Sequence, residues 1–98
     1  MGWAKKAVAL SPDSSPLYDT LGWAERAAGN LAGAASSLSK AIQLESTVAG
    51  YHFHLGVVQG EMKQPAAARV SLQKALQLDK QLPQADEARR LLKALPAA

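Results

Sequence analysis

His52 and His54 are the first residues in this chain whose type suggests chemistry. On a helix, two histidines that share a metal ion stand four residues apart, as in His-Glu-x-x-His, because that spacing places both rings on one face. A spacing of two separates the rings by about 200° around the helix axis. We therefore expect the pair to hold no metal, with His52 partly filling a core position and His54 on another side of the helix.

Ser36, Ser37 and Ser39 are the second candidate group, as a source of a nucleophile. They lack the Gly-x-Ser-x-Gly elbow that exposes a catalytic serine, and nothing in the pattern supplies a base. The glycines fall at helix ends and packing positions rather than in a phosphate-binding loop. The chain has no cysteine, which excludes disulfides and thiolate metal sites. We predict that the chain is not an enzyme and binds no cofactor.

The composition favours closely packed helices. Apolar residues make up 48% of the 98 residues and aromatic residues only 5%, with alanine and leucine dominant. The net charge of the chain is +3. Its basic residues are distributed along the sequence, except for one group near the end that consists of Arg89, Arg90 and Lys93. This distribution gives no electrostatic footprint for nucleic acid. The sequence also lacks an apolar run long enough to predict a membrane span.

Nearly the same eight-residue segment occurs twice, 34 residues apart. SLSKAIQL at 37–44 returns as SLQKALQL at 71–78. When residues 15–48 are laid over residues 49–82 without a gap, ten positions are identical, and the matches recur at helical spacing. A fixed period of this length, filled with helical pattern, is typical of a solenoid of stacked helix pairs.

Residues that favour helix ends divide each unit into two helices. Ser15 with Pro16 is expected to cap and open the first helix, and Gly29 with Asn30 to end it and cap the second. Thr47 is expected to cap the third helix, Pro65 to open the fourth and Pro83 to begin a fifth. The expected helices span about 16–28, 31–44, 48–62, 65–79 and 83–95.

These residues resemble the tetratricopeptide repeat family, whose unit is two antiparallel helices in 34 residues. The first copy carries the family's Leu-Gly pair and its small, large, small series as Leu21, Gly22, Ala34, Leu38 and Ala41. The second copy repeats them as Leu55, Gly56, Ala68, Leu72 and Ala75. The family's related RNA-reading repeats usually have a period of 35, which together with the modest charge argues against them.

Some positions depart from the family's pattern. Glu25 and Gln59 stand where tyrosine is usual, and His52 occupies the aromatic position that Tyr18 fills in the first copy. Proline is also replaced near the end of both copies. We expect looser packing around these positions. The mid-helix glycines, Gly22 and Gly56, are expected where the paired helix approaches closely, opposite Ala34 and Ala68.

The resemblance implies an all-α fold, a right-handed superhelix of about six helices. Residues 1–12 would be the second helix of a truncated preceding repeat, and residues 15–48 and 49–82 two full repeats. Residues 83–95 would form a C-terminal capping helix. The phrase LYDTLGW, residues 17–23, is similar to terminal repeats of bacterial envelope-associated members of the family. We therefore expect the C-terminal part of a longer bacterial protein, from the cytoplasm or the cell envelope.

The resemblance also implies the function, binding of a protein or peptide partner in a concave groove lined by the first helix of each repeat. The family's groove positions fall here on ten residues: Asp19, Thr20, Trp23, Arg26 and Ala27 in the first copy, and Phe53, His54, Val57, Gly60 and Glu61 in the second. Of these, the predicted binding residues are Asp19, Trp23, Arg26, Phe53, His54 and Val57. Trp23 and Phe53 would be aromatic anchors, although core positions between repeats explain both rings equally well. The lysine and asparagine residues of the chaperone-binding carboxylate clamp are absent from the corresponding positions, so we expect no binding of that type.

A structural role is the alternative. In that case the chain only packs on neighbouring repeats or on a second copy of itself. Trp3, Val8 and Leu10 form an apolar group in the first segment, for which the preceding helix of a full repeat is lacking. The pattern therefore predicts self-association through the N-terminal segment as a homodimer, either two-fold symmetric or formed by exchange of that helix between chains.

Overall fold

The computed structural model describes residues 5–6, 10 and 13–96, and this part of the chain is helical without strands. It contains the five helices α2 (Ser15–Ala27), α3 (Leu31–Leu44), α4 (Ala49–Glu61), α5 (Pro65–Leu78) and α6 (Ala85–Ala94). The predicted all-α class is confirmed. A sixth helix, expected within residues 1–12, falls on a segment that lies mostly outside the described residues.

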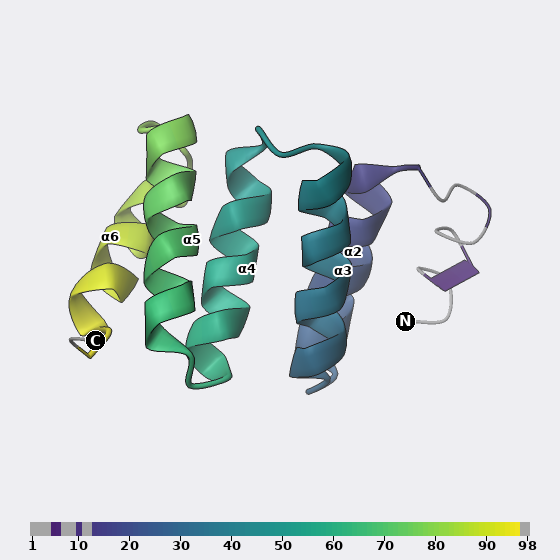
Figure 1. Ribbon diagram of the computed structural model, residues 1–98, viewed down its shortest axis with the longest axis horizontal. Coiled ribbons are helices and arrows are strands. Elements are labelled where there is room, and N and C mark those ends of the chain that lie inside the picture. The colour runs from purple at the N-terminus through teal and green to yellow at the C-terminus, as the bar shows by residue number, and fades with distance from the viewer. Residues whose placement is uncertain (1–4, 7–9, 11–12, 97–98) are drawn as a thin grey trace.

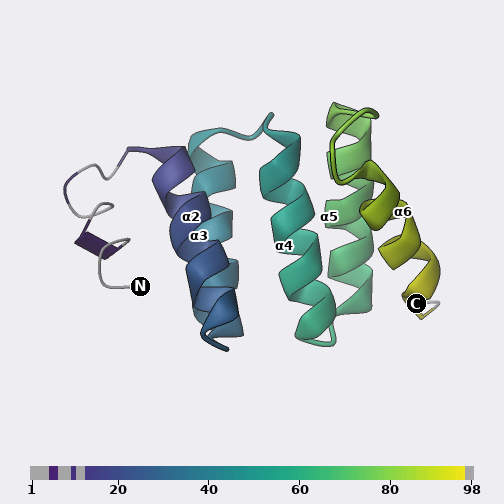
Figure 2. The ribbon, with the colours of Figure 1, turned by 180° about the vertical axis from the view of Figure 1, so that it is seen from behind.

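The helices stand side by side and alternate in direction (Figure 1). They form two rows. The row of α3 and α5 is nearer the viewer in Figure 1, and the row of α2, α4 and α6 is nearer the viewer in Figure 2, which shows the molecule from behind. Within this arrangement α2 packs on α3, α3 on α4, and α4 on α5, while α6 packs mainly on α5. The surface formed by the second row is called the α2–α4–α6 face below.

Some of the expected helix ends are confirmed. The side chain of Asn30 accepts a 3.0 Å hydrogen bond from the backbone N–H of Gly33 and so caps α3. Gly29 ends the preceding helix with a φ of 86°, a conformation that glycine adopts without strain. Pro65 begins α5 as expected.

Other expected ends are wrong. Ser14, not Ser15, precedes the first residue of α2, and its side chain makes no capping bond. Val48 rather than Thr47 takes the capping position before α4, again without a side-chain bond. Pro83 lies two residues before α6 instead of at its start. In each case packing of the helix against its neighbours compensates for the missing cap.

Each of the two core clusters contains one of the leucines that the repeat places in equivalent positions. Leu38 and Leu72 are buried in α3 and α5 and lie against the glycines of the preceding helix. A Cβ atom at Gly22 would lie 2.8 Å from Leu38 Cγ, and one at Gly56 would lie 2.7 Å from Leu72 Cγ. The expected close approach is therefore confirmed, but the crowding atoms belong mainly to the leucines and not to Ala34 and Ala68.

Two polar pairs replace the tyrosine that is usual in the family. The buried carboxylate of Glu25 accepts a 2.5 Å hydrogen bond from Ser37 Oγ. At the equivalent position of the second unit, Gln59 Oε1 accepts a 2.6 Å bond from Ser71 Oγ. Each substituted acceptor thus finds a serine on the paired helix, which satisfies its hydrogen-bonding capacity.

The position assigned to His52 also needs correction. His52 is half-buried, and its Nε2 lies 2.9 Å from the carbonyl oxygen of Ser46 rather than in the core. The preceding residue, Tyr51, is the buried aromatic, with its hydroxyl 3.1 Å from Ser15 Oγ. Ser15 also donates a 2.5 Å hydrogen bond to Glu45. Ser15 therefore joins the starts of α2 and α4 to the end of α3, which explains why it does not act as a cap.

Candidate partner-binding surface

All six predicted groove residues lie on α2 and α4, and five of them keep part of their side chain at the surface. Asp19, Trp23 and Arg26 belong to α2, where spacings of four and three residues place them on one side of the helix. His54 and Val57 belong to α4 and share one side in the same way. The α2–α4–α6 face, seen in Figure 2, therefore collects residues from both repeats.

Phe53 is the exception. Its side chain is 5% exposed and belongs to a core cluster with residues of α5 and α6 such as Leu72 and Ala88. It therefore has almost no surface left for a ligand. Of the two interpretations that the sequence left open for this ring, the structure favours the core.

A continuous series of contacts joins α2 and α4. The ring of His54 is stacked on Trp23 with 4.1 Å between centroids and 30° between planes, and its Nδ1 lies 2.7 Å from Asp19 Oδ1. The guanidinium carbon of Arg26 lies 4.6 Å from the centroid of the Trp23 ring. Arg26 also donates hydrogen bonds of 2.6 and 3.0 Å to the two carboxylate oxygens of Glu61. We call these five residues the α2–α4 ladder.

The ladder lies at the surface, and within it the charges of Arg26 and Glu61 are paired. The side chains of Arg26 and Glu61 are 31% and 42% exposed, so solvent screens their interaction. Trp23 is only partly buried, and the hollow beside it, of about 360 Å³, is lined chiefly by small side chains of α2 such as Thr20, Ala24 and Ala27. The indole therefore offers an apolar surface held at a fixed orientation by its neighbours.

Val57 lies in a different hollow, between α4 and α6, which also has a volume of about 360 Å³. Its apolar lining includes Leu91 of α6 and Leu95 just after that helix, which the sequence did not suggest as surface residues for binding. The signal was present, because moving Val57 forward by one 34-residue period gives Leu91. The repeat pattern marks the C-terminal helix as a cap, and this correspondence adds a groove position to it.

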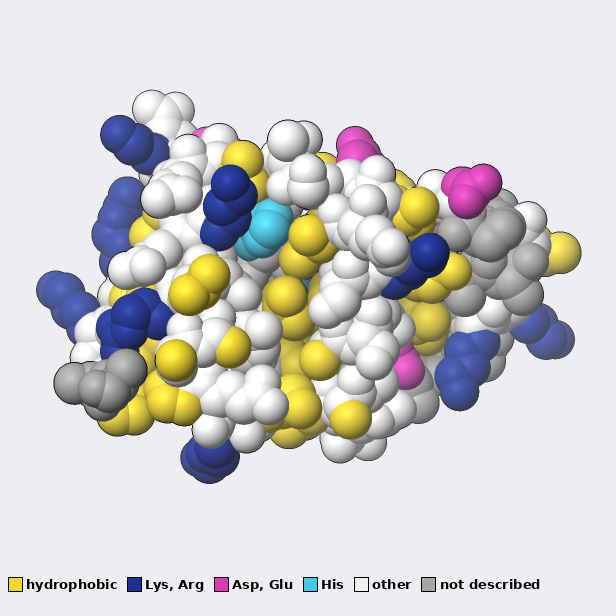
Figure 3. Space-filling view, viewed as in Figure 1, with side chains coloured by type: hydrophobic (Ala, Val, Ile, Leu, Met, Phe, Trp, Pro, Cys, Tyr) yellow, Lys and Arg dark blue, Asp and Glu magenta, His cyan; other side chains and the backbone are white. Residues whose placement is uncertain are grey.

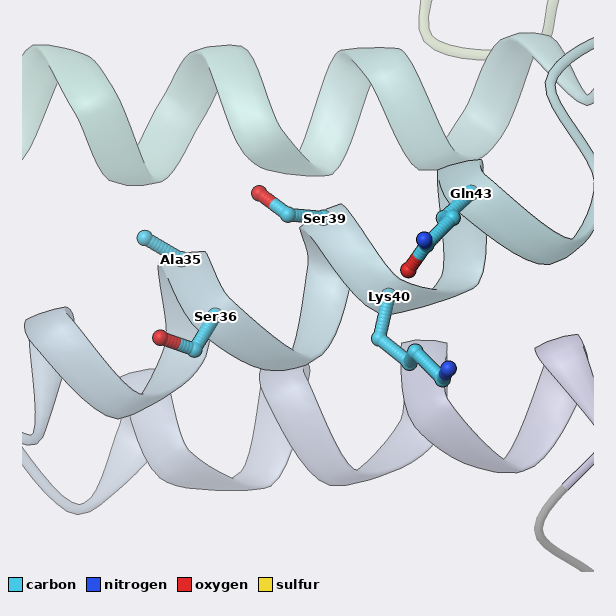
Figure 4. Close-up of a pocket in the computed structure, with 5 residues that line it drawn as sticks. All are labelled: Ala35, Ser36, Ser39, Lys40 and Gln43. Carbon is cyan, nitrogen blue, oxygen red and sulfur yellow. The ribbon is translucent and has the colours of Figure 1, made fainter.

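A hollow on the opposite side of the molecule has different properties. It is lined by Ala35, Ser36, Ser39, Lys40 and Gln43, which all belong to α3 (Figure 4). Since a single helix supplies the lining, the polar side chains project from one surface and do not converge on a common point. Figure 3 shows this side of the molecule, where hydrophobic atoms occur in small groups between polar and basic side chains. Of the three serines considered as nucleophiles, Ser36 and Ser39 line this hollow, whereas Ser37 is buried and bonds Glu25.

Other kinds of site have little support in the described ranges. Among residues 5–6, 10 and 13–96, no three histidine, aspartate or glutamate side chains gather where they could hold a metal ion. The two histidines contact different partners, as their helical spacing predicted. Within the same ranges, none of the helices has the length and apolar character needed to span a membrane.

Comparisons with known proteins agree with the repeat pattern. Residues 49–82 match the family described as tetratricopeptide repeat. The crystal structure of MamA is similar over 94% of this chain and 52% of its own, with a TM-score of 0.85 and 25% sequence identity. No curated protein sequence matches the chain.

A second solved structure with a similar fold is SycD, the type III secretion translocator chaperone of Yersinia enterocolitica. The likeness covers 94% of this chain and 66% of SycD, with a TM-score of 0.87 and 19% identity. SycD in complex with a peptide of the translocator YopD gives a TM-score of 0.85 at 21% identity, over 94% of this chain and 73% of SycD. The chain thus spans about half of MamA and about two thirds of SycD, and the identity to SycD shows a shared fold alone.

Proposed function

The chain is a tetratricopeptide repeat protein, and from this premise we propose that its α2–α4–α6 face binds a segment of another protein. Repeats of this family are scaffolds and typically not enzymes. The observation that carries the proposal is the α2–α4 ladder, which holds the partly exposed ring of Trp23 beside an apolar hollow. Aromatic side chains with fixed orientation and adjacent arginine are frequent at the centres of protein interfaces.

The structure of SycD with a peptide of YopD supports the proposal by analogy. SycD has the same fold as this chain and binds a peptide in that structure. The repeat organisation belongs to the same proposal: residues 15–48 and 49–82 act as two repeats, followed by residues 83–95 as a cap. In this arrangement α2 and α4 are the first helices of their repeats and supply most of the binding face.

Replacing Trp23 tests the proposal. Peptides that bind the protein are first selected from a displayed library of short random sequences, and their affinities are measured by fluorescence anisotropy. We expect Trp23→Ala to weaken binding at least about tenfold, since the indole is the largest apolar surface of the ladder. The matched control is Gln43→Ala on the outer surface of α3, which should leave the affinity unchanged. Equal affinities for Trp23→Ala and wild type would contradict the proposal.

Self-association through the N-terminal segment is a second candidate, favoured by the exposure of Leu10. That side chain is 85% exposed, although apolar. Trp3 and Val8, which belong to the same predicted apolar group, lie outside the described residues. Light scattering over a concentration series should show a dimer that Leu10→Glu and Val8→Glu shift toward monomer. A monomer at every concentration would leave partner binding as the remaining proposal.

A further inference from the structure

The hollow next to Val57 continues into a groove between α4 and α6. Its first part has a volume of about 360 Å³ and its second part about 440 Å³. Both parts are lined by Gly60, Lys63, Ala94 and Leu95, so they are continuous. The first part also reaches the buried Leu72 beneath α4 and α6. We call the whole depression the α4–α6 groove.

Gly60 keeps this groove open. A Cβ atom at Gly60 would meet no other atom within 4 Å, whereas one at Gly56, a single turn earlier, would lie 2.7 Å from Leu72 Cγ. Packing therefore requires glycine at position 56 but not at position 60. Glycine is unfavourable in a helix compared with alanine, and packing requires it neither at position 60 nor at position 50. What distinguishes Gly60 is that it lines both parts of the groove. Its effect in this structure is to leave space for an added side chain.

The rim of the groove carries one charge without an intramolecular partner. Arg26 pairs with Glu61, and Glu87 pairs with Arg90. Lys63, in the turn between α4 and α5, lines both parts of the groove and forms no ion pair with the residues that the structure describes. The groove is thus apolar along its walls and has an uncompensated positive charge at its edge.

We propose that the α4–α6 groove receives a bulky aliphatic or aromatic side chain of an acidic peptide segment. The apolar side chain lies over Gly60 between Val57 and Leu91, where it removes apolar surface from water. A carboxylate of the same segment pairs with Lys63 at the rim. This inference rests on the proposed function, since it names the chemistry that one part of the α2–α4–α6 face recognises.

Filling the groove tests the inference without disturbing the core. The peptides selected as binders are measured against Gly60→Leu, which places a side chain where the partner's side chain would lie. We expect binding to weaken at least about tenfold. The matched control is Gly50→Leu, because Gly50 lies near the other end of α4 and a Cβ there also meets no atom within 4 Å. This control should bind like wild type, and circular dichroism should show the same helix content for all three proteins.

The charge at the rim is tested by exchanging the signs of the charges on Lys63 and on the peptide. Lys63→Glu should weaken binding of the acidic peptides, and replacing the peptide's carboxylate residue with lysine should restore it. Selected peptides without an acidic residue, or a Lys63→Glu variant that binds like wild type, would overturn the recognition of a carboxylate.

The remaining outcomes separate the inference from the proposed function. Peptides that lose affinity with Trp23→Ala but not with Gly60→Leu would overturn the groove and leave the binding face intact. Peptides indifferent to both variants would overturn both, as would a library that yields no binder. Light scattering compares the oligomeric states of wild type and Gly60→Leu. If only the wild type forms a dimer, a second copy of the chain occupies the groove, and this result would also overturn the inference.

Discussion

Phe53→Ala is expected to lose about 3–5 kcal/mol of unfolding free energy. The ring is 5% exposed and packs in the cluster that joins α4, α5 and α6. Removing it leaves a cavity that the neighbouring side chains, Leu72 and Ala88 among them, cannot fill without moving helices. Urea unfolding followed by circular dichroism measures the loss. A change below about 1 kcal/mol would mean that Phe53 is not in the core.

Trp23→Ala is the comparison for this result. Its ring is partly exposed and contacts His54 and Arg26 rather than the two core clusters. We expect a smaller loss, about 1–2 kcal/mol, from the ring stack and the cation–π contact. The two aromatic residues were equivalent candidates in the sequence, and the difference between their unfolding free energies separates core from surface. Equal losses would remove the distinction on which the binding face depends.

Gly56→Leu is expected to destabilise the protein by about 1–3 kcal/mol, because α4 has no space for a side chain at this position. A Cβ atom would already lie 2.7 Å from Leu72 Cγ and 3.3 Å from the backbone nitrogen of Leu72. Leu72 is itself buried at the centre of the repeat, so it cannot move away at low cost. Thermal and urea unfolding of the variant and wild type would measure the effect.

Gly60→Leu provides the control on the same helix. It introduces the same side chain one turn later, where an added Cβ meets nothing within 4 Å. Since leucine is a better helix former than glycine, we expect stability to be unchanged or raised by up to about 1 kcal/mol. Equal losses of unfolding free energy in Gly56→Leu and Gly60→Leu would contradict the difference in space around these two glycines.

Much of the fold could be predicted from the sequence because its signals are periodic. The 34-residue repetition and the glycine and proline positions predicted α3 at Leu31–Leu44, and the other four described helices within about two residues at each end. Caps were predicted less well. Ser15 has the residue type of a cap, but its hydroxyl instead bonds Glu45 and lies near Tyr51. Those partners are 30 and 36 residues away, and local propensity carries no information about them.

The candidate site was predictable only in part. Helical spacing placed Asp19, Trp23 and Arg26 together, but it could not show that Phe53 is in the core while the adjacent His54 stacks on Trp23. That difference depends on the angle at which α4 meets α2 and α5, which the sequence pattern does not determine. The groove beside α6 could not be predicted for a related reason, since the space between α4 and a capping helix also depends on the angle at which the two helices pack.

Chemical-shift mapping by nuclear magnetic resonance tests the central claim most directly. A selected peptide is titrated into the ¹⁵N-labelled protein, and the amides whose signals move are placed on the structure. We predict that they cluster on the α2–α4–α6 face, within residues 19–27, 54–63 and 87–95, together with the indole N–H of Trp23. Shifts concentrated instead on the outer surfaces of α3 and α5 would contradict the assignment of this face as the partner-binding surface.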